Sequence, residues 1–102
     1  MSPSLASAQS GNCITSNLMR VDAAFSRHGA GGTFDYLIQV SNLSQRPVTF
    51  RVTFRMTNVQ VNPQILGRPF TLPPNGNGLI ILANGREQTQ STRINGGVQL
   101  TC

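Results

Sequence analysis

The chain has 102 residues, of which 38% are hydrophobic, so the composition predicts one small domain with a modest core and excludes a second domain. All eight basic residues are arginines and only three residues are acidic, which gives a formal net charge of +5. This charge favours anionic surfaces or partners, although a compositional preference for arginine explains it as readily.

The first residues, 1–11, have the composition of a disordered tail. Ala6-Ser7-Ala8 followed by Gln9 has the small-x-small pattern of a signal-peptidase site, but the basic and apolar regions of a complete signal peptide are missing. We interpret the tail as a signal-peptide remnant, with the mature chain starting near Gln9. No stretch of the sequence approaches the ~20 apolar residues that cross a bilayer, so no transmembrane segment is expected.

Cys13 and Cys102 are the only cysteines. In an oxidising compartment they are expected to form one disulfide between the first and last parts of the fold. Two free thiols and an intermolecular bridge through Cys102 are the alternatives. The chain has one histidine, His28, and no CxxC motif, so neither a metal site nor a cofactor is predicted.

Two strands are predicted before residue 42. In the region 13–25, the alternation from Met19 to Phe25 indicates a strand, with a short helix as the alternative. The glycine-rich stretch 26–32 is a predicted turn, and residues 33–41 form the next predicted strand. Leu37 is an exception in that strand, expected to be exposed or in a second layer. The inner face of this strand comprises Phe34, Tyr36, Ile38 and Val40.

The clearest strand pattern is the stretch RPVTFRVTFRMT, residues 46–57, in which apolar and polar residues alternate. Successive side chains of a strand point to opposite faces, so we predict a central strand with one apolar face and one polar face. The predicted inner residues are Val48, Phe50, Val52, Phe54 and Met56. The predicted outer residues are Thr49, Arg51, Thr53, Arg55 and Thr57.

The remaining segments are predicted from changes of phase and from turn residues. The apolar phase shifts near Asn58, which indicates a bulge or a change of strand, and residues 62–69 are expected to form an edge segment or a crossover loop. Residues 79–83 are predicted to be a deeply buried strand that ends in a hairpin at Asn84-Gly85. Residues 86–94 are expected to form a polar strand or irregular edge, joined by a turn at 95–97 to the last strand.

About seven short strands with no convincing helix describe an all-β antiparallel sandwich over residues 12–102, with a small barrel as the alternative. Three segments are similar to bacterial periplasmic immunoglobulin-like domains, including the first domain of pilus-assembly chaperones. The similar segments are Val40-Ser41-Asn42, Pro47 to Val52, and Pro69 to Pro74 leading to Ile80 and Leu82. The resemblance implies an immunoglobulin-like fold and a periplasmic or extracellular location. The chaperones also have a second domain and a basic Arg/Lys pair, whereas this chain has no lysine.

No arrangement of residues indicates an enzyme. His28 lies in a glycine-rich turn without a recognisable nucleophile beside it, and Asp22 and Asp35 are expected to serve as structural partners of arginines. The chain is therefore predicted to be non-enzymatic.

Two kinds of binding surface are predicted. The outer face defined above, Thr49 to Thr57, could bind an anionic glycan or a lipid headgroup, or it could be an ordinary solvent-facing strand. Nucleic acid is not expected, because most of the few aromatic residues are needed in the core. A strand edge within 58–72 or 86–94 could instead pair with a protein partner.

The leading functional hypothesis is an exported protein-binding module, a chaperone-like accessory or adaptor in a cell-envelope or surface-fibre assembly. One alternative is a structural subunit of a surface polymer that donates residues 1–12 to a neighbour. The other alternative is an anion- or glycan-binding domain that uses the arginine-rich strand face.

Overall fold

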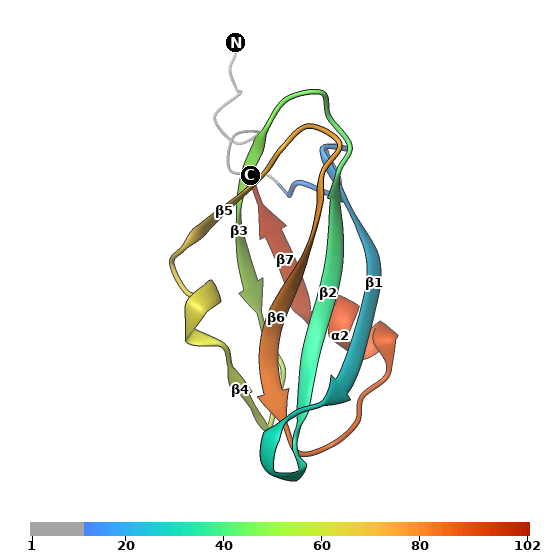
Figure 1. Ribbon diagram of the computed structural model, residues 1–102, viewed down its shortest axis with the longest axis vertical. Helices are drawn as coiled ribbons and strands as arrows, with labels where there is room; N and C mark the ends of the chain where they lie inside the picture. Colours follow the sequence, from blue (N-terminus) through green and yellow to red (C-terminus); the bar gives the residue numbers. More distant parts are fainter. Residues whose placement is uncertain (1–11) are drawn as a thin grey trace.

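The alternating stretch around Phe50 forms β3 (Val48–Phe54), which is the middle strand of one of two facing sheets (Figure 1). The structure is a computed structural model, and it describes residues 12–102. The three-stranded sheet has the order β5-β3-β7, with β5 at Pro69–Leu72 and β7 at Val98–Thr101. The four-stranded sheet has the order β1-β2-β6-β4, and all the pairings in both sheets are antiparallel.

The strands of the four-stranded sheet are β1 (Met19–His28), β2 (Phe34–Asn42), β6 (Asn77–Gly85) and β4 (Val59–Val61). The described residues also contain one short α-helix, α2 (Ser91–Gly97), and the 3-10 turns η2 (Ala30–Gly32) and η3 (Pro63–Ile65). The predicted all-β sandwich of seven strands is therefore confirmed.

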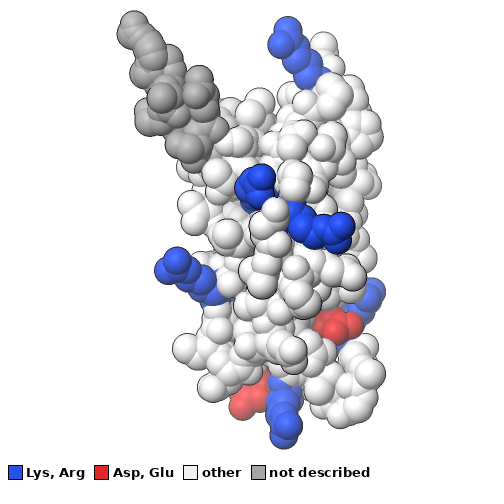
Figure 2. All heavy atoms as spheres, turned by 90° about the vertical axis from the view of Figure 1, so that its left-hand side faces the viewer, with Lys and Arg blue, Asp and Glu red and all other residues white. Residues whose placement is uncertain are grey.

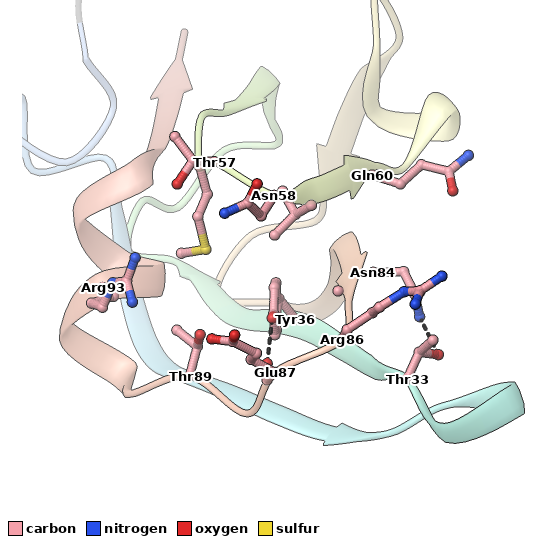
Figure 3. A pocket seen from close by; sticks show the side chains of 13 residues that line it. Thr33, Tyr36, Thr57, Asn58, Gln60, Asn84, Arg86, Glu87, Thr89 and Arg93 are labelled. Atoms are coloured by element: carbon pink, nitrogen blue, oxygen red, sulfur yellow. Dashed lines mark hydrogen bonds between the residues drawn. The ribbon is translucent and has the colours of Figure 1, made fainter.

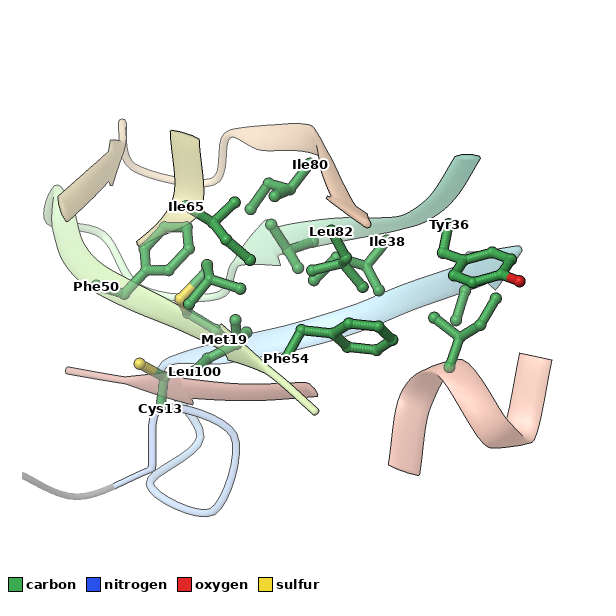
Figure 4. Close-up of a cluster of buried hydrophobic side chains, with 14 of the residues drawn as sticks. Cys13, Met19, Tyr36, Ile38, Phe50, Phe54, Ile65, Ile80, Leu82 and Leu100 are labelled. Carbon is green, nitrogen blue, oxygen red and sulfur yellow. The ribbon is translucent and has the colours of Figure 1, made fainter. Parts of the chain in front are cut away.

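The core lies between the two sheets and follows the predicted faces of β2 and β3 (Figure 4). Every second residue of β3 is buried, from Val48 to Phe54, and the residues between them are exposed. The Phe50 ring stacks on Phe70 of β5 with the ring centroids 5.7 Å apart. The four-stranded sheet contributes the buried side chains of Tyr36, Ile38, Val40, Ile80 and Leu82.

The phase shift near Asn58 is a change of sheet. Asn58 has a positive φ of 61°, and the chain turns there from β3 into β4, which pairs with β6 in the other sheet. The chain then returns through η3, where the Asn62 side chain accepts a hydrogen bond from the backbone N–H of Gln64. Ile65 is 1% exposed and joins the core beside Phe50. The predicted crossover over residues 62–69 is confirmed.

The prediction for residues 79–85 is partly wrong. The strand alternates instead of being buried throughout, because β6 has one face on the core and one outside: Leu79 is 52% exposed and Ile81 is 38% exposed. Asn84-Gly85 is not a hairpin turn but the end of β6, still paired with β2 and β4. Leu37 of β2 lies between Ile81 and Phe25 in the register and is fully buried, so the exposed alternative for Leu37 is also wrong.

No strand forms between residues 86 and 94. Residues 86–90 have no regular structure, and α2 follows, burying Ile94 completely and packing against β1. The predicted turn at 95–97 belongs to this helix. β7 pairs with β3 instead of with the preceding segment, because the chain crosses here from the four-stranded sheet to the three-stranded one. A local hairpin cannot make that crossing.

The first strand has a register shift between Val21 and Ala23, which leaves Asp22 as an extra residue in β1. The shift exchanges the two faces of the strand, so Ala24 is buried and Ala23 is exposed. The predicted alternation is therefore wrong beyond Val21. Before Met19 the chain forms turns, in which the Asn12 side chain accepts a hydrogen bond from the Ile14 N–H at 2.7 Å.

The sulfur atoms of Cys13 and Cys102 are at disulfide distance, as predicted, and their Cα atoms lie 5.3 Å apart. Cys13 is fully buried, and the adjacent Asn12 forms a bridge with Thr101 of β7. The signal-peptide interpretation concerns residues 1–11, which lie outside the described residues. Within residues 12–102, no helix is both long enough and apolar enough to cross a membrane.

Candidate functional site

The predicted binding face on β3 is divided by the end of the strand. Thr49, Arg51 and Thr53 are exposed on β3, whereas Arg55 and Thr57 lie beyond its last residue, Phe54. The exposed strand residues also make contacts within the protein. The Thr49 and Thr71 hydroxyls are 2.9 Å apart, and Arg51 donates from Nη1 to the Gly67 carbonyl at 2.8 Å.

Beyond the strand, the Arg55 N–H donates to the Gly97 carbonyl at 2.8 Å, while Thr57 lines a hollow at the end of the sandwich. The five residues therefore do not form one continuous strip. Figure 2 shows the side of the molecule that carries β4 and β5, where the arginines are spread along the long axis. The β3 face is best described as a solvent-facing sheet surface with internal cross-strand contacts.

The prediction of strand edges is correct for residues 58–72. This segment supplies β4 and β5, each of which is the outer strand of its sheet. The prediction of a strand edge is wrong for residues 86–94, because residues 86–90 have no regular structure and residues 91–94 belong to α2. β1, which was not predicted to be an edge, is the other outer strand of the four-stranded sheet and has ten residues.

Among residues 12–102, β1 pairs only with β2. On its outward side, no backbone hydrogen bond joins residues 20–28 to another described segment. One side-chain hydrogen bond joins this edge to the segment before α2: the Ser26 hydroxyl donates to the Thr89 carbonyl at 3.5 Å. Figure 1 shows α2 and the preceding chain alongside this edge.

A groove follows the outward edge of β1, between this strand and the segment that contains α2. It consists of two hollows of about 600 and 340 Å³, the first beside Phe25 and Ser26 and the second beside Val21 to Ala24. Ser91, the first residue of α2, lines both hollows. The opposite wall of the groove is formed by uncharged polar residues: Gln88, Thr89, Gln90, Ser91, Thr92 and Asn95.

An ion pair lies near each end of β1. The Arg20 Nε lies 2.6 Å from Asp22 Oδ1, and the Ser41 hydroxyl donates to the other oxygen of the same carboxylate. The Ser41 hydrogen bond, followed by the hydrogen bond and positive charge of Arg20, lowers the pKa of Asp22 below its ordinary value of 3.8. At the far end, Arg27 Nε is 3.8 Å from Asp35 Oδ2.

The residues considered for catalysis have structural partners. The His28 ring lies beside Phe34, with the centroids 5.0 Å apart. Asp22 pairs with Arg20, and Asp35 accepts a hydrogen bond from Asn84 at 3.0 Å. Among residues 12–102, no three His, Cys, Asp or Glu side chains are grouped so that they could hold a metal ion.

A third hollow, of about 580 Å³, lies at the end of the sandwich (Figure 3). Its walls come from the turn between β3 and β4, the end of β6, the first residues of β2 and helix α2. It holds Thr57, the last residue of the predicted face, together with two arginines from residues 86–94. Sequence reasoning missed this site because its residues come from four separate segments.

No family model, curated protein or solved structure matches the chain. Its function is therefore inferred from the free edge of β1 and from the hollow at the end of the sandwich.

Proposed function

We propose that the chain is an exported, non-enzymatic protein-binding module that accepts an extended segment of a partner protein along β1. In this proposal it acts as a chaperone-like accessory or adaptor in a cell-envelope or surface-fibre assembly. The observation that carries the proposal is a ten-residue outer strand whose outward backbone is not paired with any other segment of residues 12–102 and faces a groove.

An unpaired strand edge presents a row of N–H and C=O groups at fixed spacing, which is the complement of another extended chain. A segment that pairs with β1 would become the fifth strand of the four-stranded sheet. Natural sheets discourage such pairing with bulges and charges, and β1 has both at Asp22. The stretch from Ala23 to Ser26 has no charge, so the pairing is proposed to be centred there.

The groove also defines the chemistry of the partner. Its wall offers amides and hydroxyls, from Gln88 to Asn95, and the strand beside it carries the small side chains of Ala23 and Ala24. A partner segment with small and polar side chains facing α2 fits these surroundings. The one charged group of the lining, Asp22, already pairs with Arg20, so long charged side chains of a partner would find no free counter-charge there.

The cysteine pair supports export. A disulfide between Cys13 and Cys102 persists in oxidising compartments such as the periplasm or the extracellular space, and is rare in the cytosol. The resemblance to periplasmic immunoglobulin-like domains points to the same location.

The proposal is tested with a displayed library of random peptides as long as β1. Selection against the oxidised protein is expected to yield peptides of small and polar residues that bind the wild type. Ser91→Arg should abolish this binding, because Ser91 is exposed where the two hollows meet and the larger side chain would fill the groove.

Gln45→Arg is the matched control, since it adds the same charge at an exposed loop position that lines neither hollow. The proposal predicts full binding in this variant. It is refuted if the library yields no binder, or if Ser91→Arg and Gln45→Arg bind the selected peptides equally well.

A further inference from the structure

We propose that the hollow at the end of the sandwich is a second binding site, for a saccharide that carries a single carboxylate, as in a uronic acid. This site does not depend on β1 or on the proposed protein partner. It differs from the β3 face in that its lining residues surround a concave space of about 580 Å³, within the usual size range of small-molecule sites.

The backbone around the hollow is held in place by specific contacts. The Tyr36 hydroxyl donates to the Glu87 carbonyl, which fixes the chain as it leaves β6. The Asn84 amide donates at 3.0 Å to both the Thr33 hydroxyl and the Asp35 carboxylate. On the opposite side, Asn58 adopts a left-handed conformation that turns the chain into β4. The site is therefore formed before any ligand binds.

Two arginines flank the hollow. Figure 3 shows Arg93 on the α2 side and Arg86 on the β6 side, with Tyr36, Glu87 and Thr89 between them. Neither guanidinium forms a salt bridge or a hydrogen bond with any of residues 12–102. Glu87 is the only acidic residue of the lining, so the charged lining residues sum to +1.

The net charge of the hollow and its uncharged polar residues together indicate the chemical class of the ligand. A net charge of +1 matches a monoanion, and a planar guanidinium pairs well with a planar carboxylate. A phosphate or a polysulfated sugar would bring more negative charge than the site balances, with Glu87 nearby. Hydroxyls and amides suited to sugar hydroxyls line the rest of the hollow: Thr33, Thr57, Asn58, Gln60, Asn84 and Thr89.

Apolar contact is available on one side of the same hollow. Met56 and Val59 are half-buried lining residues, and they offer carbon surface to the C–H face of a sugar ring. A saccharide combines hydroxyls, a carboxylate and apolar ring faces, whereas a simple carboxylate would leave the amides and hydroxyls unused.

The test uses a disaccharide with one glucuronic acid residue and the methyl ester of the same disaccharide. Titration followed by amide NMR is expected to shift the signals of Thr57, Asn58 and Gln60 with the acid, and to show at least about tenfold weaker binding of the ester, because the ester removes the charge-assisted hydrogen bonds. Arg86→Gln and Arg93→Gln should each weaken binding of the acid, and the loss should reach about tenfold for the arginine that pairs with the carboxylate.

Arg68→Gln is the matched control, because it removes one positive charge from an exposed residue outside the hollow. Asn58→Gly retains a residue that tolerates the left-handed turn and removes only the amide, so it should weaken binding without unfolding the protein. The proposal is overturned if the acid does not bind, if acid and ester bind equally, or if Arg68→Gln weakens binding as much as Arg86→Gln.

Discussion

The Tyr36 side chain lies against the backbone of Gly85, and a Cβ atom at position 85 would overlap the tyrosine oxygen. Tyr36 is 2% exposed, and its hydroxyl is held by the Glu87 carbonyl, so the ring cannot move aside without losing that contact. Position 85 therefore has room only for a glycine, at the end of a strand that is still paired with β2 and β4.

Gly85→Ala is therefore expected to destabilise the protein by about 1–3 kcal/mol, which is typical of overpacking in a well-packed interior. Chemical denaturation measures the change in the free energy of unfolding. Gly96→Ala is the control, since a Cβ there meets nothing within 4 Å and the residue lies in α2. It should be neutral or slightly stabilising. Equal effects of the two substitutions would contradict this account of Gly85.

Within residues 12–102, Asn42 is the one polar residue among the buried side chains, at 2% exposure, and its amide links two loops. It donates to the carbonyls of Arg46, Leu72 and Pro73 at 2.7, 3.2 and 3.0 Å. Asn42→Asp keeps the shape but replaces the donor with an acceptor, so we expect a loss of about 3 kcal/mol in unfolding free energy. The exposed Asn77→Asp should change stability by less than about 0.5 kcal/mol. A stable Asn42→Asp variant would show that the three bonds contribute little.

The Cys13–Cys102 bridge closes almost the whole described chain, with a sequence separation of 89. Replacing both cysteines by serine should lower the free energy of unfolding by about 4 kcal/mol, because the unfolded chain gains conformational freedom. Dithiothreitol should destabilise the wild type and leave the double variant unchanged. Two alkylatable thiols in the purified, unreduced protein would rule out the bridge.

Asp22 gives the protein a pH dependence of predictable sign. Its pKa is lowered in the folded state, so its carboxylate stabilises the fold above the ordinary value of 3.8, and this contribution is lost as the pH falls through the lower folded pKa. The difference in stability between wild type and Asp22→Asn should therefore be largest near neutral pH and shrink in acid.

The Ser41→Ala variant tests why the pKa of Asp22 is lowered, since the Ser41 hydrogen bond is the largest contribution to that shift. NMR titration of the Asp22 carboxyl in the Ser41→Ala variant should give a pKa closer to the ordinary value. An unchanged titration would assign the shift to Arg20 instead.

Much of the fold follows from local patterns. The alternation in β3 predicted its buried face residue by residue, and the loss of phase at Asn58 predicted the change of strand. Both signals are local, because burial on one face requires a period of two. The bulge at Asp22 was not predictable, because the register shift between Val21 and Ala23 is defined only by the pairing of β1 with β2.

The candidate sites could be predicted from the sequence less well than the fold. α2 has two glycines in its last three residues, and it was missed because burial of Ile94 against the core outweighs their poor helix propensity. Without α2, neither the groove beside β1 nor the position of Arg93 in the hollow could be inferred. The unpaired edge of β1 depends on strand order, which the pattern of a single strand does not contain.

The central claim is that β1 accepts an extended segment, and hydrogen exchange of its backbone amides tests it most directly. With a selected peptide bound, we predict new protection of amides between Ala23 and Arg27 in wild type, and no new protection in β5, the outer strand of the other sheet. Protection in β5 or β4 without any change in β1, or no change in any strand, would contradict the claim.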